Sequence, residues 1–423
     1  MSINAYRRKY AYGEDYGTSY FKFGPVAEEP YMIENRGYFI PDTIITRVAG
    51  VTKTLVVGPE VTQYLGSKED AAKYLVYPMR DGIVRRGDTR AWQVLKELTR
   101  YGFEQTMPQE AKDFEGFYVT AALSAIAPKY MYEEFFQMHA DLDEELGAVK
   151  AVTIIPQPLA VAIAQKAVTC TVVESGHGNT QITPISQYPI RGAIVSLNRG
   201  GAEADAITGE ILKDAGYGDL ASEEKLVRMV KENIGLIPRD LDEAIRKAKE
   251  NPEKFKAHYK VPGTLTEIDL EENSWMRFLI GEIIFNPEHE IFQSYYRRGL
   301  PRPRDTVIGD EKIPGTIKLG HAIAISVGKT SVELQPYLYK RIILSGGNFA
   351  WKVPPEFEDV ACDAATKIYL QMKELDLEVR AELTSDPAYS VWKGAIVYSI
   401  ALPDDYLWDW NRMEGWYKRG VHY

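Results

Sequence analysis

The sequence of 423 residues predicts an α/β protein built from two similar halves. Strand-like runs alternate with amphipathic helical segments along the whole chain. The chain is also longer than a single ordinary hydrophobic core requires. Finally, a strand, an acidic residue, a glycine bend and a second strand occur near the N-terminus, and the same arrangement returns after residue 150. Two related lobes explain these observations together.

Composition excludes several classes of function. Hydrophobic residues make up 45% and charged residues 26% of the chain, as in ordinary globular proteins, and the formal net charge is -10. A general nucleic-acid binder needs a basic field, so we expect no nucleic-acid partner. The basic segment from Arg297 to Arg304 is either a solvated loop or a site for an acidic partner.

The cysteines and histidines predict neither disulfides nor a histidine metal site. Cys170 and Cys362 are the two cysteines of the sequence, and the six histidines lack metal-binding spacing. The N-terminus has no signal-peptide pattern, and no run approaches the ~18 apolar residues of a membrane span. We therefore expect a reducing, cytoplasmic location without membrane insertion.

The first half opens with the segment 12–24, "YGEDYGTSYFKFG", which predicts two strands joined by a glycine bend. A further strand is expected at 54–58. Amphipathic spacing predicts a helix that begins at Asp88 and stops at Gly102, and a second helix is expected over 115–127.

The second half repeats this design. An apolar run at 151–155 is followed by Pro158, which suits the first turn of a helix. The segment 170–185, "CTVVESGHGNTQITPI", then predicts a second hairpin with an acid before its bend. The same number of residues separates Asp15 from Glu174 as separates Gly17 from Gly176. Related lobes are the interpretation we favour, with two unrelated hairpins as the alternative.

The remaining segments predict helices and one long surface connection. Helices are expected at 202–216, at 222–235 with Ser222 as its N-cap, and at 239–251. The stretch from Phe285 to His321 is rich in proline, glycine and charge and is typical of a surface excursion. The aromatic segment 404–423 is expected to be ordered and to dock on the first half.

The first bend has the chemistry of a phosphate site. Turns with glycine and hydroxyl residues point several N–H groups into one concavity, and Thr18 and Ser19 add hydroxyl donors. Asp15 would repel a bare phosphate, but it can hold the waters of Mg²⁺. Lys22 on the returning strand is placed to reach a β-phosphate, and an exposed strand lysine is the alternative.

Two other positions have a less specific pattern. Gly346 and Gly347 follow a buried strand and allow close approach of a backbone to a ligand, although a plain turn explains them equally well. Gln157 stands between two prolines at a helix start, and its amide can orient a water for attack on a γ-phosphate. The alternative is that Gln157 and its two proline neighbours only mark the start of a helix.

Seven segments, taken in order, resemble the nucleotide-binding motifs of the actin superfamily: "DYGTSYFK", "PQPLAVAIA", "ESGHGNTQ", "LNRGG", "LVRMVKE", "LSGG" and "YSVWKGA". The segments "YPMRDGIVRRGD" and "YSVWKGA" make the likeness one to actin itself. The segments "AWQVLKELTRY" and "RFLIGEIIFNPEHE" are similar to those of the archaeal actins, the crenactins. The resemblance runs from about Tyr10 to Trp416.

The resemblance implies a cytoskeletal ATPase with an actin-like fold, in which four subdomains surround a central cleft for Mg-ATP. It implies head-to-tail filaments, with ATP, ADP, Mg²⁺, further copies of the chain and accessory cytoskeletal proteins as ligands and partners. The first lobe would comprise 1–157 plus 388–423, with an outer subdomain at about 36–87. The second would comprise 158–387, with an outer subdomain at about 202–280.

The resemblance also implies roles for individual residues. Catalysis would involve Gln157, Glu174 and Gln181, and the metal would be held by Asp15 and, through water, by Glu174. The nucleotide would be bound by Gly17, Thr18, Ser19, Tyr20 and Lys22 in the first loop, Gly176, His177, Gly178 and Asn179 in the second, and Gly201, Arg228, Lys231, Glu232, Gly346, Gly347, Asn348 and Trp351 around the nucleoside.

The sequence departs from conventional actins at four positions. Glu174 and His177 stand where those actins have aspartate, Gln181 replaces a histidine that positions water, and Ala388 replaces a lysine near adenine. ATP binding is still expected, whereas the rate of hydrolysis does not follow from the sequence. The alternative functions are a non-polymerising actin-related scaffold and a small-molecule kinase of the same superfamily.

Overall fold

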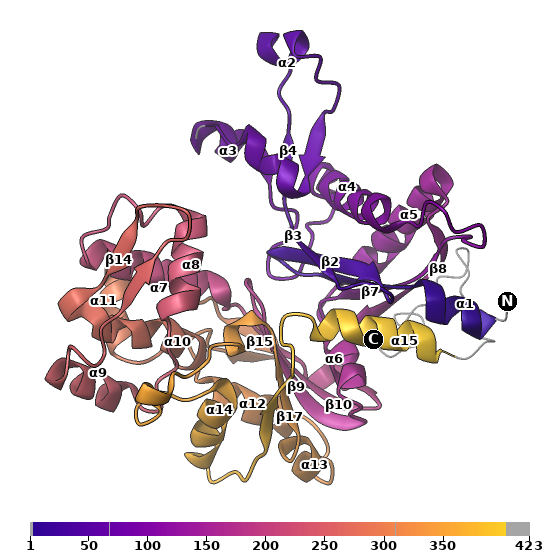
Figure 1. Cartoon of the computed structure of the whole chain (residues 1–423). Coiled ribbons are helices and arrows are strands. Elements are labelled where there is room, and N and C mark those ends of the chain that lie inside the picture. Colours follow the sequence, from indigo (N-terminus) through magenta and orange to yellow (C-terminus); the bar gives the residue numbers. More distant parts are fainter. Residues whose placement is uncertain (1–2, 67, 309, 403–423) are drawn as a thin grey trace. The chain divides into compact units, whose positions relative to one another are not determined.

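The computed structural model describes residues 3–66, 68–308 and 310–402. The chain divides into two compact units, Met1–Ala167 with Tyr389–Tyr423, and Val168–Ala388 (Figure 1). The sequence placed the boundaries after residues 157 and 387, and the contacts place them after Ala167 and Ala388. The aromatic segment 404–423 lies outside the described residues.

A five-stranded sheet forms the centre of the first unit. Its order is β3-β2-β1-β7-β8; β1, β2 and β3 pair antiparallel, and β1, β7 and β8 pair parallel. Helices α4 and α5 cover one face, and α6 and α15 cover the other (Figure 1). The elements are α1 (Ile3–Tyr10), β1 (Ala11–Tyr16), β2 (Tyr20–Pro25), β3 (Tyr31–Glu34), α4 (Thr89–Thr106), β7 (Phe117–Leu123), α5 (Lys129–Leu146), β8 (Val149–Pro156), α6 (Gln157–Ala164) and α15 (Ser390–Ala401).

A smaller three-stranded sheet, in the order β5-β4-β6, belongs to the same unit. It packs its own small core around Tyr38, Val56 and Val61. Its elements are β4 (Gly37–Phe39), α2 (Ile44–Val48), β5 (Leu55–Val57), the 3-10 helix η1 (Gly58–Tyr64), α3 (Lys68–Tyr74) and β6 (Leu75–Val76).

The second unit contains a sheet with the path β11-β10-β9-β17-β18, and β12 also pairs with β10. Its strands are β9 (Thr169–Ser175), β10 (Thr180–Ser186), β11 (Tyr188–Pro189), β12 (Val195–Leu197), β17 (Ile342–Ser345) and β18 (Ala381–Leu383), with the separate pairs β13 (His258–Lys260) and β14 (Glu267–Asp269), and β15 (Thr306–Ile308) and β16 (Glu311–Ile313).

Helices of the second unit cover this sheet and build a separate helical layer. They are α7 (Gly201–Asp214), α8 (Glu224–Ile234), α9 (Leu241–Glu250), α10 (Arg277–Phe285), α11 (Ile291–Arg297), α12 (Leu319–Gly328), α13 (Gln335–Tyr339) and α14 (Ala364–Lys373), with the 3-10 helices η2 (Arg191–Ala193), η3 (Glu271–Met276), η4 (Gly347–Phe349) and η5 (Pro355–Phe357).

The two main sheets share one pattern of strand directions. In the first, hairpin β1-β2 is followed along the sheet by the parallel strands β7 and β8. In the second, hairpin β9-β10 is followed by the parallel strands β17 and β18. The hairpin registers also match, because Asp15 lies opposite Lys22 and Glu174 lies opposite Gln181. This common topology supports two related halves over two unrelated hairpins.

Two predictions for the first unit were wrong. The segment 115–127, expected to be a helix, contains strand β7, in which every residue is buried. A parallel strand covered on both faces is apolar throughout, so its sequence lacks the alternation that marks a strand. Helix α4 continues past Gly102 to Thr106. Gly102 serves packing and not termination, since a methyl group there would lie 3.1 Å from the Tyr12 hydroxyl and from the Phe23 ring.

Two predictions for the second unit need correction as well. Helix α8 begins at Glu224, and the hydroxyl of Ser222 donates to the carbonyl of Asp219 instead of capping that helix. The stretch 285–321 contains α11 and the β15-β16 pair, and Phe292 and Ile313 within it are buried. This stretch is therefore partly packed and not a purely exposed connection.

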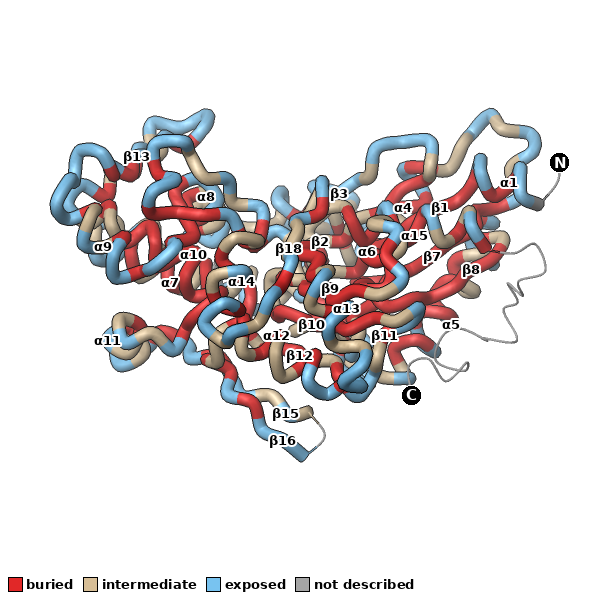
Figure 2. The backbone as a smooth tube through the Cα atoms, turned by 90° about the horizontal axis from the view of Figure 1, so that it is seen from below, coloured by how far each residue is buried: buried red, intermediate tan, exposed pale blue. Residues whose placement is uncertain are grey.

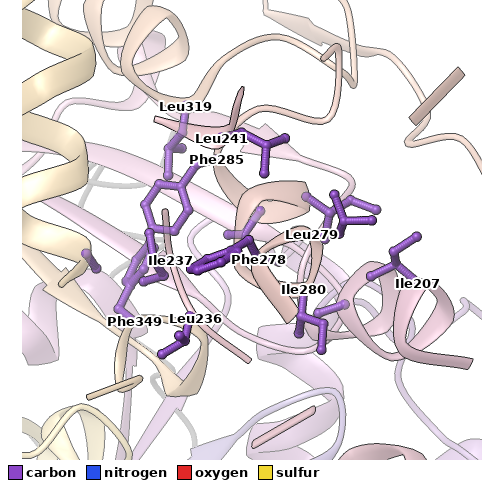
Figure 3. Close-up of a cluster of buried hydrophobic side chains, with 14 of the residues drawn as sticks. Ile207, Leu236, Ile237, Leu241, Phe278, Leu279, Ile280, Phe285, Leu319 and Phe349 are labelled. Atoms are coloured by element: carbon purple, nitrogen blue, oxygen red, sulfur yellow. The ribbon is translucent and has the colours of Figure 1, made fainter. Parts of the chain in front are cut away.

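Buried side chains are concentrated on the central strands of each unit (Figure 2). In the second unit, a large apolar cluster joins the helical layer to the sheet. Figure 3 shows Phe278 and Ile280 from α10 beside Leu236 and Ile237 of the loop after α8. Burial of a side chain of this size contributes about 1.5–3 kcal/mol. These cores hold the hairpin ends in place.

Gly394 in α15 tests the close packing of α15 on α6. A methyl group at Gly394 would overlap the carbonyl of Ala160, so Gly394→Ala is expected to destabilise the protein by about 1–3 kcal/mol. Gly328→Ala is the matched control, because it also lies in a helix and a methyl there meets no atom within 4 Å. Chemical unfolding of both variants makes the comparison. Equal stability of the two variants would contradict the close packing of α15 on α6 at Gly394.

Candidate functional site

The first bend connects β1 to β2 through residues 17–20. The Gly17 N–H donates to the Tyr20 carbonyl at 3.0 Å, which closes a tight loop with Thr18 and Ser19 at its tip. Asn35, which follows β3, supports the loop from behind. Its side-chain N–H donates to the Gly17 carbonyl at 2.7 Å, and its backbone N–H donates to the Ser19 carbonyl at 2.8 Å.

Asp15, the last acidic residue before this bend, is buried between two donors. The Lys22 ammonium donates to one carboxylate oxygen at 2.9 Å, and the Gln157 amide donates to the other at 2.8 Å. Lys22 reaches Asp15 because the hairpin register places the two residues opposite each other. Gln157 reaches it because α6 begins where β8 ends. The structure thus brings together three residues that the sequence predicted separately.

The hydrogen bonds of Gln157 fix the orientation of its amide. Its Nε2 donates to Asp15 and, at 3.2 Å, to the carbonyl of Tyr16. Two oxygen acceptors on the same side define that atom as nitrogen. The carbonyl oxygen Oε1 of Gln157 is therefore turned away from Asp15 and can accept a hydrogen bond from a water.

Thr18 links the bend to the segment 77–88. The N–H of Gly82 donates to the Thr18 hydroxyl at 2.9 Å. Thr18, Ser19, Tyr20 and Lys22 are half-buried, so the outer side of the bend retains access to solvent.

The second bend, residues 176–179, closes in the same way. The Gly176 N–H donates to the Asn179 carbonyl at 3.0 Å, the same distance as in the first bend. Asn348 supports it through its side-chain N–H, which donates to the Gly176 carbonyl at 2.6 Å and to the Ser175 hydroxyl at 3.0 Å. Gly346 precedes Asn348 with φ of 100°, where a side chain would overlap the Ser175 carbonyl. That position therefore requires glycine.

Helix α7 begins directly against the second bend. The N–H groups of Gly201 and Ala202 donate to the carbonyls of Gly176 and His177, each at 2.9 Å. A methyl group on Gly200 would overlap the Gly176 carbonyl, so the close approach depends on glycine. The first turn of α7 is thereby fixed to the loop that the sequence predicted to bind phosphate.

Lys231 and Trp351 meet beside α8. The Trp351 indole N–H donates to the Lys231 carbonyl at 3.3 Å. The Lys231 ammonium lies 2.8 Å from a carboxylate oxygen of Asp205 on α7, and the His177 Nδ1 lies 3.6 Å from Asp205. Arg228 is half-buried and Glu232 is exposed on the same helix as Lys231. Gly347, expected in this group, is exposed.

Glu174 and Gln181 lie opposite each other at the base of the second hairpin. The Gln181 amide donates to the Asn179 side-chain oxygen at 3.4 Å, and the Asn179 amide donates to the Ser196 hydroxyl, also at 3.4 Å. An amide therefore occupies the position that Lys22 has in the first hairpin. The two hairpins share a backbone geometry and differ in the charge of the residue opposite the acid.

The sequence predicted no role for Asn35 or Asp205. Each reaches its bend from another element of the same unit. A single asparagine or aspartate in a polar segment gives no signal of its own, so only the folded arrangement identifies them. The described residues contain no helix long and apolar enough to cross a membrane. They also contain no group of three or more His, Cys, Asp or Glu residues placed to hold one metal ion.

Burial lowers the pKa of His177, and the nearby Lys231 and Arg228 lower it further, while Asp205 opposes them. A histidine with a lowered pKa contributes stability above its unfolded pKa of 6.5, and that stability is lost as the pH falls through the folded value. The imidazole of His177 is therefore neutral at pH 7.

His177→Asn is expected to reduce the loss of thermal stability between pH 7.5 and pH 5, because the variant has no half-buried imidazole to protonate. His258→Asn is the control, since His258 is about half exposed beside Glu267. Calorimetry at both pH values measures the difference. An identical pH response of wild type and His177→Asn would show that the pKa of this imidazole is not lowered in the folded protein.

Comparison with known proteins places the chain in a family. The family model described as Actin matches residues 15–401. Actin-related protein 3 of Dictyostelium discoideum is 24% identical over 344 residues, covering 80% of this chain and 76% of that protein. Actin-related protein 3 of Schizosaccharomyces pombe is 26% identical over 375 residues, covering 80% and 77%. Actin-related protein 2 of Acanthamoeba castellanii is 24% identical over 298 residues, covering 70% and 66%. The match across most of its length shows that the chain belongs to the actin family and has the α/β actin-like ATPase fold.

Proposed function

We propose that this chain is an actin-like cytoskeletal ATPase that binds Mg-ATP, hydrolyses it and polymerises head to tail. Members of the actin family generally bind and hydrolyse ATP. The observation that carries the proposal is the pair of glycine bends, one in each unit, closed by the same backbone hydrogen bond of 3.0 Å. Each unit would contribute one bend to phosphate binding.

The first bend has the donors that a phosphate chain requires. Backbone N–H groups and hydroxyls at a tight turn attract phosphate oxygens, and Thr18 and Ser19 supply the hydroxyls. Lys22 lies on the returning strand, where its ammonium already contacts the Asp15 carboxylate. We propose that Lys22 also contacts the β-phosphate, because the returning strand places its ammonium beside the bend and an ammonium attracts phosphate as a compact positive charge.

The carboxylates suit a magnesium ion. Mg²⁺ usually keeps several waters and takes one or two carboxylates together with phosphate oxygens. Asp15 accepts from Lys22 and Gln157, and an ionised carboxylate with about four acceptor sites can accept further hydrogen bonds from metal-bound waters. Asp15, and Glu174 through water, are the residues we propose to hold the ion, which would neutralise phosphate charge when bound.

Gln157 is the residue we propose to position the attacking water. Because Nε2 is held by Asp15 and by the Tyr16 carbonyl, Oε1 is the atom that can accept a hydrogen bond from that water and so orient it. Gln181 is proposed as a second amide near the water, in place of the histidine of conventional actins. An amide cannot take up a proton as an imidazole can, so Gln181 can orient water but cannot act as a general base.

The nucleoside would lie against the second unit. The proposed contacts are Gly201, Arg228, Lys231, Glu232 and the segment Gly346 to Trp351, together with His177, Gly178 and Asn179 of the second bend. Support comes from the hydrogen bonds that join Gly201 to the second bend and Trp351 to Lys231. The matching segments further lead us to propose an archaeal actin of the crenactin type, with a cytoplasmic location.

Polymerisation would follow from a heterologous contact between copies, which extends into a filament when its rotation does not close a ring. A nucleotide-dependent difference of about 1.4 kcal/mol in subunit binding changes the critical concentration tenfold. The outer subdomains proposed at about 36–87 and 202–280 would contribute to such contacts.

A subunit that binds ATP without polymerising is the second candidate. The relatives reported above are named actin-related proteins, and their names favour neither assembly behaviour for this chain. The identities of 24–26% leave the assembly surfaces free to differ. The two candidates share the nucleotide chemistry and differ in self-association alone.

Gln157→Ala is expected to slow phosphate release by roughly 10–100-fold while ATP affinity changes by less than about threefold, because the amide acts on the water and not on the ground-state nucleotide. Lys22→Ala is the matched comparison and is expected to weaken ATP binding. Single-turnover hydrolysis and equilibrium titration with a fluorescent ATP measure the two effects. Unchanged turnover of the Gln157 variant would remove it from the catalytic role.

Polymerisation is expected to require Mg-ATP and to begin at a defined critical concentration. Sedimentation and light scattering across a protein dilution series, with ATP, ADP or no nucleotide, measure this concentration. A signal that stays flat with Mg-ATP, combined with tight ATP binding in the titration, would favour the non-polymerising candidate. Electron microscopy of the pellet distinguishes filaments from aggregates.

A further inference from the structure

The stretch 285–321 has no part in the proposed chemistry, yet its base is bonded to the junction of β12 and α7. Within this stretch, β15 and β16 form a hairpin, which residues 303–305 enter and residues 315–317 leave. Both connections are held by the side chains of Asn198 and Arg199, the two residues that follow β12. The same junction leads into the first turn of α7, which contacts the second bend.

Arg199 is a fully buried cation whose side chain donates to backbone carbonyls. Its Nε donates to the carbonyl of Ile284 in α10 at 3.1 Å, and its Nη1 donates to the carbonyls of Gly315 at 2.8 Å and Ile317 at 2.6 Å. Burial lowers the pKa of Arg199 to about 10, so the guanidinium stays charged at pH 7. Because a guanidinium presents its donors in fixed directions, it holds the end of α10 and the exit from β16 in one arrangement.

The base of the β15-β16 hairpin is closed by tight contacts of its own. The side-chain N–H of Asn198 donates to the carbonyls of Arg304 and Asp305, each at 3.3 Å. The Gly315 N–H donates to the Asp305 carboxylate at 3.1 Å. A methyl group on Gly315 would overlap the carbonyl oxygens of Pro303 and Arg304. The entry and the exit of the hairpin therefore pass each other with no room for a side chain at Gly315.

The backbone of Arg199 contacts the second bend directly. Its carbonyl accepts from the Thr180 hydroxyl at 2.9 Å, and that hydroxyl pairs with the Ser175 hydroxyl at 2.8 Å. Ser175 and Thr180 lie opposite each other where β9 and β10 meet the bend. The N–H groups of Gly201 and Ala202 donate to carbonyls of the bend. Arg199 thus bonds the bend through its backbone and the base of the hairpin through its side chain.

These contacts leave the junction of β12 and α7 little freedom to move alone. If the guanidinium moved away, the buried carbonyl of Gly315 would lose a charged donor, and a hydrogen bond to a charged group is stronger than one between neutral groups. A shift of the hairpin base therefore draws the guanidinium with it. The backbone of Arg199 and its contact with Thr180 shift as well.

We infer that Arg199 is a positioning residue for the second bend, and that through it the base of the β15-β16 hairpin controls how firmly this bend is held. Loosening the hairpin base frees the start of α7, opens the bend and weakens nucleotide binding, without any contact between the hairpin and the nucleotide. The part of the inference that concerns nucleotide rests on the proposed ATP binding. The part that concerns the bend does not.

Two variants test the inference from opposite ends. Gly315→Ala forces the entry and the exit of the hairpin apart and keeps the guanidinium of Arg199. Arg199→Met removes the guanidinium and keeps a long, unbranched side chain. The matched controls are Gly192→Ala, where a methyl group meets no atom within 4 Å, and Arg277→Met, which removes another buried guanidinium, one that donates to the Ile234 carbonyl at 2.9 Å.

The first measurement is hydrogen exchange without nucleotide, read by mass spectrometry over a peptide that contains Gly201 and Ala202. The amides of these two residues donate to the bend, so their exchange reports opening of the junction. We expect about tenfold faster exchange in Gly315→Ala and Arg199→Met, the change that follows from losing about one hydrogen bond to a charged group. Both controls are expected to exchange at the wild-type rate.

The second measurement is the affinity for a fluorescent ATP, together with the single-turnover rate at saturating ATP. Gly315→Ala and Arg199→Met are expected to bind ATP about tenfold more weakly, because binding must first close the loosened bend. The single-turnover rate is expected to change by less than about threefold, since Asp15 and Gln157 belong to the first unit. A general loss of structure would instead lower both quantities.

The outcomes separate the inference from the proposed function. Wild-type exchange in Gly315→Ala and Arg199→Met would overturn the coupling, and equally fast exchange in the controls would overturn the specific role of Arg199. Faster exchange with unchanged ATP affinity would overturn the role in the nucleotide site. Should Arg199→Met fail to fold, Gly315→Ala decides alone. Absence of ATP binding by the wild type would overturn the proposed function, while exchange would still decide whether the hairpin base holds the bend.

Discussion

The carboxylate of Asp15, held between Lys22 and Gln157, is the interaction on which the first unit's site depends. A buried carboxylate is costly unless it is paired and hydrogen-bonded. Here the two partners come from β2 and from the first residue of α6. The hydrogen bonds to the Asp15 carboxylate therefore connect the hairpin to the junction of β8 and α6 at residues 156 and 157. The same contacts place an ammonium and an oriented amide beside the first bend.

The two bends show how one backbone geometry can carry different chemistry. Both close with a hydrogen bond of 3.0 Å across four residues, and each is supported from behind by an asparagine side chain, Asn35 or Asn348. The first places Lys22 opposite its acid, whereas the second places Gln181 there. A cation and a neutral amide interact with phosphate differently, since the cation neutralises charge and the amide only donates. The backbone conformation is thus the same in the two bends, whereas the side chains beside them differ in charge.

Local signals account for the parts of the fold that the sequence predicted well. Glycine bends between apolar runs identified both hairpins, and Pro158 marked the start of α6, because turn and helix-start preferences act within a few residues. Strand β7 was missed because its pattern depends on helices that cover both faces. Gly102 was taken as a helix end, but it serves packing against Tyr12 and Phe23. Asn35 and Asp205 could not be predicted, since only tertiary structure brings them to the bends.

The fully buried His139 and the half-buried His177 show that the sign and distance of neighbouring charges decide in which direction the pKa of a histidine shifts. Burial is the largest influence on both, and in both it lowers the pKa. His139 has the Glu14 carboxylate at 2.7 Å and the Phe135 carbonyl at 2.6 Å, and together they raise its net pKa despite burial. His177 has a carboxylate at 3.6 Å that already contacts Lys231 at 2.8 Å, so the acid is shared with a cation and the net pKa is lowered. The pKa of His139 is thus raised behind the first bend, whereas the pKa of His177 is lowered within the second bend. A neutral imidazole can both donate and accept, which suits contact with a hydroxyl better than contact with a second cation.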